Sequence, residues 1–247
     1  MGWSADQAGT DVSERRSYPI YILLDVSASM RVSTAGRPAP QTEFTELIPD
    51  MIMTLADAPA LTEMVWISVI AFSDGAELLS PMTSLAEPPN IKAPRDGSQT
   101  NYVAALRFLR QRIDDDVRTM RAKASSTYFR ISVARPLVFF ITDGAAYAAD
   151  RYQDPAEWLP IRDGLVGAPV AARIAAIGLH GAHPRTLWAL ATGSDGGRRN
   201  AFIADPRARG DGLARSVVNM IERSIKLSVR AGALVMDEPP RMRRVDD

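Results

Sequence analysis

The chain has 247 residues, enough for one large α/β domain or two small ones, and its 46% hydrophobic and 23% charged residues are typical of soluble globular proteins. It carries 29 basic and 29 acidic residues, and this zero net charge argues against general binding to nucleic acids or membrane surfaces, which needs a basic excess or a basic face. It contains no cysteine, which excludes disulfides, thiol catalysis, iron–sulfur clusters and cysteine-ligated zinc.

The first segment of the chain, residues 1–17, is polar and rich in Gly, Asp, Ser and Glu. This composition predicts a disordered leader. The leader lacks the apolar core of a secretory signal, and no apolar run in the chain approaches the roughly 20 residues that span a bilayer. We therefore expect a cytoplasmic protein that does not enter a membrane.

Short apolar runs predict the strands of a buried sheet. The hydrophobicity of the strongest runs is continuous rather than alternating, which is typical of parallel strands covered on both faces. The runs cover residues 18–24, 65–72, 136–142, 171–179 and 200–204. A further strand, 76–85, is expected to pair antiparallel with 65–72 after the turn at 73–75.

Apolar residues at helical spacing predict helices between these strands. The predicted helices cover residues 43–55, 102–113, 185–191 and 213–225, and one more begins at Asp154, where an Asp cap is followed by Pro and Glu in the first turn. The acidic run 114–116 beyond the second helix is expected on its solvated face.

The alternation of strands and helices predicts one doubly wound, Rossmann-like α/β domain over residues 18–230. Its central sheet should be mostly parallel, with about six strands, one antiparallel edge strand and helices on both faces. Residues 231–247, which include two prolines and several arginines, are expected to form a C-terminal tail.

Polar side chains follow the predicted strands, at the edge where doubly wound sheets bind ligands. They are Asp25, Ser27 and Ser29 after the first strand, Asp143 and Gly144 after 136–142, and Thr100 and Asn101 before the helix at 102–113. The i, i+2, i+4 spacing of the first three suits a loop that turns its side chains toward one centre. A set of oxygen donors without imidazole or thiol suits hard divalent cations, particularly Mg²⁺.

These residues resemble the metal-ion-dependent adhesion site (MIDAS) of von Willebrand factor A (vWA) domains. The family's Asp-x-Ser-x-Ser matches Asp25, Ser27 and Ser29, and its strand-ending Thr-Asp-Gly matches Thr142, Asp143 and Gly144. Its Gly-x-Thr-Asn region, followed by Ala-Leu, resembles Ser98 to Asn101 and Ala105–Leu106, although Gln99 replaces the usual second glycine. The resemblance covers about residues 18–230.

Within this family the chain is similar to compact bacterial proteins of the tellurium-resistance (TerY-like) group, which share PIYILLDVSASM and the later FIAD. The resemblance implies that Ser27, Ser29 and Thr100 coordinate Mg²⁺ or Mn²⁺ directly, while Asp25 and Asp143 act mostly through water. Because these hydroxyl ligands are neutral, we expect a partner protein to supply an Asp or Glu to the metal. The implied setting is a bacterial stress-response or conflict system with kinases, phosphatases or ATPases.

Other interpretations of the same residues remain open. Ser27 and Ser29 also suit a turn, and Asp25 and Thr100 suit helix caps. The spacing of His180 and His183 could suit a metal, but the sequence shows no third ligand, and a surface or structural pair is favoured.

Three functions are compatible with these residues. The favoured one is a non-enzymatic, metal-dependent interaction module. The alternative is a Mg²⁺-dependent phosphohydrolase that uses Asp25, although Ser27 occupies the position where such enzymes carry a second Asp as general acid. The third is a structural subunit with a vestigial site, which the complete set of oxygen ligands disfavours.

Overall fold

The computed structural model describes residues 14–33, 38–125, 130–193, 197–207 and 212–246. Within these ranges the centre of the molecule is an eight-stranded sheet in the order β10-β9-β8-β5-β1-β2-β3, with β4 paired to the beginning of β1. The strands are β1 (Glu14–Asp25), β2 (Val65–Phe72), β3 (Ala76–Ser84), β4 (Arg130–Val133), β5 (Leu137–Thr142), β8 (Arg173–Gly178), β9 (Ala201–Ala204) and β10 (Met242–Arg244). A separate hairpin consists of β6 (Tyr147–Ala148) and β7 (Arg151–Tyr152).

The five central strands, β9, β8, β5, β1 and β2, run parallel, which confirms the predicted doubly wound α/β class. The strand β3 pairs antiparallel with β2 after a tight turn, as expected from the sequence. A second antiparallel edge strand, β10, pairs with β9 at the opposite edge.

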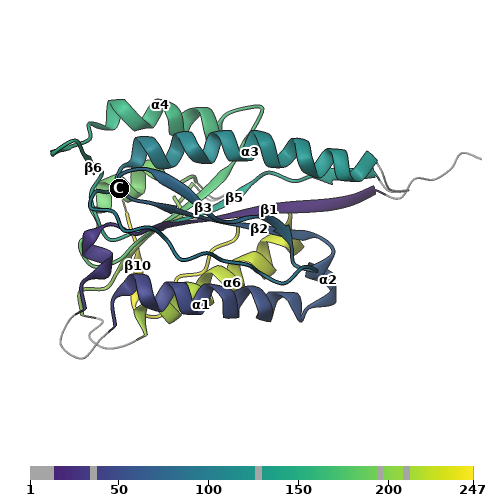
Figure 1. Cartoon of the computed structure of the whole chain (residues 1–247), viewed down its shortest axis with the longest axis horizontal. Coiled ribbons are helices and arrows are strands. Elements are labelled where there is room, and N and C mark those ends of the chain that lie inside the picture. Colours follow the sequence, from purple (N-terminus) through teal and green to yellow (C-terminus); the bar gives the residue numbers. More distant parts are fainter. Residues whose placement is uncertain (1–13, 34–37, 126–129, 194–196, 208–211, 247) are drawn as a thin grey trace, which may run out of the picture.

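Helices cover both faces of the sheet, with α1 and α6 on one side and α3 and α4 on the other (Figure 1). The helices are α1 (Pro40–Ala56), α2 (Pro59–Thr62), α3 (Tyr102–Ser125), α4 (Pro155–Val166), α5 (Pro184–Leu190) and α6 (Leu213–Ala231), with a 3₁₀ turn η1 (Ala28–Arg31) after β1. None of the described helices is both long and apolar enough to cross a membrane.

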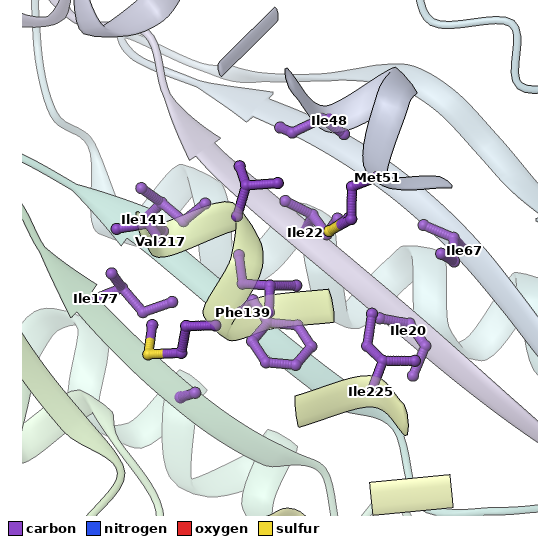
Figure 2. Packing of buried hydrophobic residues seen from close by; sticks show 14 of the residues in the cluster. Ile20, Ile22, Ile48, Met51, Ile67, Phe139, Ile141, Ile177, Val217 and Ile225 are labelled. Atoms are coloured by element: carbon purple, nitrogen blue, oxygen red, sulfur yellow. The ribbon is translucent and has the colours of Figure 1, made fainter. Parts of the chain in front are cut away.

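The strand β1 shows why its hydrophobicity is continuous. Ile20 and Ile22 belong to the cluster under α1 and α6, whereas Tyr21 and Leu23 belong to the cluster under α3 and α4. Figure 2 shows the first cluster, in which Phe139 of β5 lies among side chains of β1 and α6. Since each face is covered by helices, both sets of alternating side chains are buried, and each fully buried aliphatic side chain contributes about 1.5–3 kcal/mol.

The sheet extends beyond the predicted domain at both ends. Residues 1–13 of the predicted leader lie outside the described residues, but 14–17 are part of β1 and pair with β4. The predicted tail contains β10, and Met242 and Val245 are buried. Both segments are polar in sequence, and only their pairing with strands distant in the chain makes them part of the sheet.

The prediction that the acidic run 114–116 lies on the solvated face of α3 is wrong at Asp116, whose side chain is buried. The hydroxyl of Tyr21 donates a hydrogen bond of 3.1 Å to Asp116, and the guanidinium of Arg112 donates one of 2.6 Å. Burial raises the pKa of Asp116, while Arg112 and Tyr21 oppose that rise. Asp116 therefore connects α3 to the central strand β1 by a hydrogen bond.

Candidate metal centre

The candidate site lies where β1 and β5 end side by side. The two strands are parallel neighbours, so Asp25, the last residue of β1, and Asp143, the first residue after β5, reach the same edge of the sheet. This edge also carries the β6–β7 hairpin (Figure 1). It is the position where doubly wound sheets bind ligands.

The loop after β1 turns sharply around the carboxylate of Asp25. The backbone N–H of Ser27 donates to Asp25 Oδ1 over 2.9 Å, and the hydroxyl of Thr142 donates to Asp25 Oδ2 over 2.6 Å. Both carboxylate oxygens are thus bonded to the protein, and the side chain is fully buried. Asp25 organises the loop by holding its backbone to the end of β5.

The two serines of this loop form a chain of oxygens with Asp143. The hydroxyl oxygens of Ser27 and Ser29 are 3.2 Å apart, and the hydroxyl of Ser29 donates to Asp143 Oδ1 over 2.8 Å. Ser27 is buried and Ser29 is exposed, so the chain runs from the interior to the surface. The structure therefore joins four of the five predicted ligands by hydrogen bonds.

Thr100, the fifth predicted ligand, approaches from the loop before α3. A Cβ atom on Gly144 would lie 3.0 Å from Thr100 Oγ1, so the glycine after Asp143 allows the threonine side chain to come close. The backbone of Thr100 exchanges two hydrogen bonds of 3.0 Å with Tyr147 of β6. Within the described residues its hydroxyl has no hydrogen-bond partner, which leaves the oxygen available to a ligand.

The side chain that caps the start of α3 is that of Asn101, not that of Thr100. Asn101 Oδ1 accepts a hydrogen bond of 3.0 Å from the N–H of Ala104 in the first turn of α3. The side chain of Asn101 also donates to the backbone carbonyl of Asp74, and Gln153 donates to Asn101 Oδ1. Because Asn101 Oδ1 accepts from Ala104 and Gln153 Oε1 accepts from Tyr102 and Val103, the first-turn N–H groups do not need the hydroxyl of Thr100.

The residues that hold the loop of Thr100 in place are not among those predicted from the sequence. The carboxylate of Asp74 accepts hydrogen bonds from the N–H and the hydroxyl of Ser98, and these bonds lower its pKa. Arg31 of η1 donates to the carbonyl of Gly97 over 2.6 Å and pairs with Asp96 at 3.1 Å. Arg31 therefore links the loop after β1 that carries Ser27 and Ser29, the serine loop, to the loop of Thr100. Nothing in the local sequence pattern predicts this pairing.

The electrostatics of the site favour a cation between the two carboxylates. Burial raises the pKa of Asp25 to about 7, against the hydrogen bonds of Thr142 and Ser27, and nearby Asp143 adds to the rise. Burial also raises the pKa of Asp143. Among the described residues neither carboxylate forms an ion pair with an arginine, lysine or histidine. Two buried like charges without a counterion are costly, and a divalent cation would compensate them.

The donor set fits a hard cation. It consists of three hydroxyls and two carboxylates from three loops, and hard cations such as Mg²⁺ take oxygen ligands. The part of the chain that the structure describes contains no group of three or more His, Cys, Asp or Glu residues that could hold a metal by themselves. His180 and His183, next to the start of α5, thus acquire no third such ligand there.

Comparison with known proteins agrees with this fold. The sequence profile of the von Willebrand factor type A domain matches residues 20–145, which is 126 of the 247 residues. The chain belongs to the von Willebrand factor type A domain family. The match ends just after Asp143 and Gly144, so it includes all five predicted ligands. A search of curated proteins finds no match.

Solved structures extend the similarity of this vWA domain to most of the chain. Proximal thread matrix protein 1 from the mussel byssus is 16% identical with a TM-score of 0.54, and the alignment covers 88% of this chain and 48% of that chain. A von Willebrand factor type A protein from Catenulispora acidiphila is 16% identical with a TM-score of 0.50, over 85% of this chain and 43% of that chain. Another structure of the mussel protein has a zinc-occupied MIDAS motif, at 17% identity and a TM-score of 0.46, over 85% and 46% of the two chains. This chain spans about half the length of these structures.

Proposed function

We propose that this vWA domain is a metal-dependent interaction module. In this proposal Mg²⁺ or Mn²⁺ binds at a MIDAS formed by Asp25, Ser27, Ser29, Thr100 and Asp143. An Asp or Glu of a partner protein then completes the coordination shell. The observation that carries the proposal is the chain of hydroxyls from Ser27 to Asp143, which starts beside a buried, uncompensated carboxylate and reaches the surface.

The charge of the inner shell explains why the partner should be acidic. If the hydroxyls of Ser27, Ser29 and Thr100 are the direct ligands, they bring no negative charge to the cation. The carboxylates behind them are bonded to the loops, so they compensate the cation only in part. A carboxylate that arrives at the open coordination position therefore forms a desolvated, charge-assisted contact, which is worth far more than a surface ion pair.

The geometry of Asp25 supports a binding function over the alternative phosphohydrolase. A nucleophilic aspartate needs an accessible oxygen, but both oxygens of Asp25 accept hydrogen bonds and the side chain is fully buried. Ser27, at the position of the expected general acid, has no acidic proton to give at neutral pH. We therefore propose that the chain is not an enzyme.

The setting of this module follows from its resemblance to the TerY-like group. The shared segment PIYILLDVSASM covers the second part of β1 and the serine loop, and FIAD covers the last three residues of β9 and Asp205 after it. A module of this group would act in the cytoplasm, in a bacterial stress-response or conflict system. Kinase, phosphatase or ATPase components of that system are the proposed partners.

Calorimetric titration with Mg²⁺ and Mn²⁺ tests the metal site. We expect Asp25→Ala to abolish binding while the variant stays folded, because it removes a charge and the organiser of the serine loop. The matched control is Thr54→Ala, which removes a hydroxyl from α1 outside the site. Equal metal affinity of the wild type and Asp25→Ala would contradict the assignment.

A pull-down from bacterial lysate, with and without chelator, then tests the interaction. Partner capture should disappear with chelator and with Ser27→Ala or Thr100→Ala, but persist with Thr54→Ala. A complex that survives chelator and both site variants would show that the partner binds elsewhere. Metal-dependent hydrolysis of a generic phosphoester that Asp25→Ala removes would instead favour the phosphohydrolase.

A further inference from the structure

A second candidate site lies at the amino-terminal edge of the sheet, opposite the metal centre. A cavity of about 200 Å³ opens there between the beginnings of β1, β5 and β8 and the end of α6. Tyr18, Arg135 and Arg173 line it from the sheet, and Ser228 and Leu234 line it from α6 and the segment that follows. None of the described residues that line it is acidic.

The pleat of the sheet brings a third arginine toward this cavity. Arg16 lies two residues before Tyr18 on β1, so its side chain is on the same face of the sheet. Its guanidinium lies over the Tyr18 ring, 5.4 Å from the ring centre. Its Nη1 atom is 3.4 Å from the point where a Cβ on Gly232, another lining residue, would lie. Arg16 therefore borders the same cavity wall.

Arg173 is held on this face by its strand pairing. It lies opposite Leu137, which packs in the cluster under α1 and α6, and its backbone N–H donates to the carbonyl of Pro136. Arg135 lies just before β5, two residues from Leu137. Three positive side chains, from β1, from the segment just before β5 and from β8, thus line or border one small cavity.

The positive charge of this cavity has no partner in the described part of the chain. Arg16, Arg135 and Arg173 form no ion pair with any described carboxylate. The buried hydroxyl of Ser228 accepts a hydrogen bond of 2.9 Å from the N–H of Val235, and its own hydrogen has no acceptor among these residues. Three guanidinium groups and one hydroxyl donor therefore line or border the cavity, and no carboxylate of the described residues pairs with them.

We infer that this cavity binds the phosphate group of a small phosphorylated molecule. Guanidinium groups bind phosphate and carboxylate through paired N–H donors, and three of them match the charge of a phosphate dianion better than that of a single carboxylate. The volume of about 200 Å³ is below the roughly 300–1,000 Å³ of sites that enclose a drug-sized ligand. It suits the phosphate group with a small substituent, and it does not involve the metal centre.

The test is a calorimetric titration of the full chain with inorganic phosphate and with glycerol 3-phosphate, in metal-free buffer of fixed ionic strength at pH 8. Acetate at the same ionic strength is the carboxylate arm. At least one of the two phosphate compounds should bind at a single site, and acetate should not bind. Binding of glycerol 3-phosphate but not of inorganic phosphate would identify an esterified phosphate as the ligand. Equal binding of acetate and both phosphates, or no binding of either phosphate, would overturn the inference.

Variants locate the binding. Arg173→Gln and Arg135→Gln should each weaken phosphate affinity about tenfold or more, since each removes charged hydrogen-bond donors. The matched control is Arg107→Gln, an exposed arginine of α3 on the other face of the sheet. Arg135→Lys, which keeps the charge but loses the paired donors, should fall between wild type and Arg135→Gln. Unchanged phosphate affinity in folded Arg173→Gln and Arg135→Gln would place binding elsewhere and refute the site.

Discussion

At the scale of single residues, the candidate metal centre buries two carboxylates close to each other, and burial disfavours their charged forms. Burial raises the pKa of both Asp25 and Asp143, which means that the folded chain holds their charged forms at a cost. The hydroxyls of Thr142 and Ser29 reduce this cost without removing the charge. Such a pair is stable in its charged form when a cation lies between the two groups.

This cost predicts opposite effects of Asp143→Asn on stability and binding. Asparagine keeps an oxygen that can accept the Ser29 hydroxyl but carries no charge, so the metal-free variant should be about 1–2 kcal/mol more stable than wild type. Mg²⁺ should raise the melting temperature of the wild type, because it binds the native state, and should have little effect on the variant. Thermal unfolding with and without millimolar Mg²⁺ measures both effects. A variant that is less stable without metal, yet still stabilised by Mg²⁺, would refute this account.

At the scale of elements, the hairpin β6–β7 and the start of α4 position the loop of Thr100. The hairpin bonds to Thr100 through Tyr147, and the side chain of Gln153 accepts from the N–H of Tyr102 at the start of α3. The helix α4 begins with the predicted capping box of Asp154 and Glu157. Arg151 of β7 donates two hydrogen bonds to Glu157, of 2.7 and 2.8 Å, so the hairpin is tied to the helix start.

The capping box predicts a pH dependence. The hydrogen bonds from Arg151 and the N–H of Asp154 lower the pKa of Glu157 to about 2, below its ordinary value of 4.5. A lowered pKa in the folded state means that ionised Glu157 stabilises the fold above about pH 4.5, and that this stabilisation is lost as the pH falls toward 2. Glu157→Gln should therefore lose less stability than wild type between pH 5 and pH 2.5. Urea unfolding across this range measures the difference, with the exposed Glu87→Gln as control. A pH profile identical to that of wild type would contradict it.

At the scale of the whole molecule, the C-terminal segment completes the sheet instead of leaving it. The strand β10 pairs with β9 through three residue pairs, and the guanidinium of Arg244 lies over the Phe202 ring, 4.6 Å from its centre. The same arginine donates to the carbonyl of Arg199 over 2.8 Å. This edge strand protects β9, whose outer edge would otherwise present unpaired backbone groups.

The position of β10 predicts a clear difference between two neighbouring side chains. Met242 is buried, so Met242→Ala should reduce the free energy of unfolding by about 2–4 kcal/mol. Arg243 is exposed, and Arg243→Ala should change it by about 0.5 kcal/mol or less. Urea unfolding of both variants measures these values. Equal, negligible effects would mean that the segment is a tail, as its polar sequence suggests.

Local patterns in the sequence were enough to predict several elements and part of the candidate site. Continuous apolar runs predicted β1, β2 and β5, because a strand buried on both faces needs apolar side chains at every position. Their ends then indicated Asp25 and Asp143, since parallel strands finish at one edge of the sheet. The capping box at Asp154 was predictable for the same reason, as all its groups lie within four residues.

Contacts between residues that are distant in the chain could not be predicted and are known from the folded structure. Whether Asn101 or Thr100 caps α3 depends on space beside Gly144 and on Asp74, and whether Asp116 is exposed depends on Tyr21 of another strand. The strands β4 and β10 form because their backbones pair with the beginning of β1 and the outer edge of β9, which no other described strand occupies. Contacts between side chains of distant segments leave no periodicity in the sequence. The arginines at the opposite edge of the sheet, like the predicted ligands of the metal centre, therefore come together only when the sheet has formed.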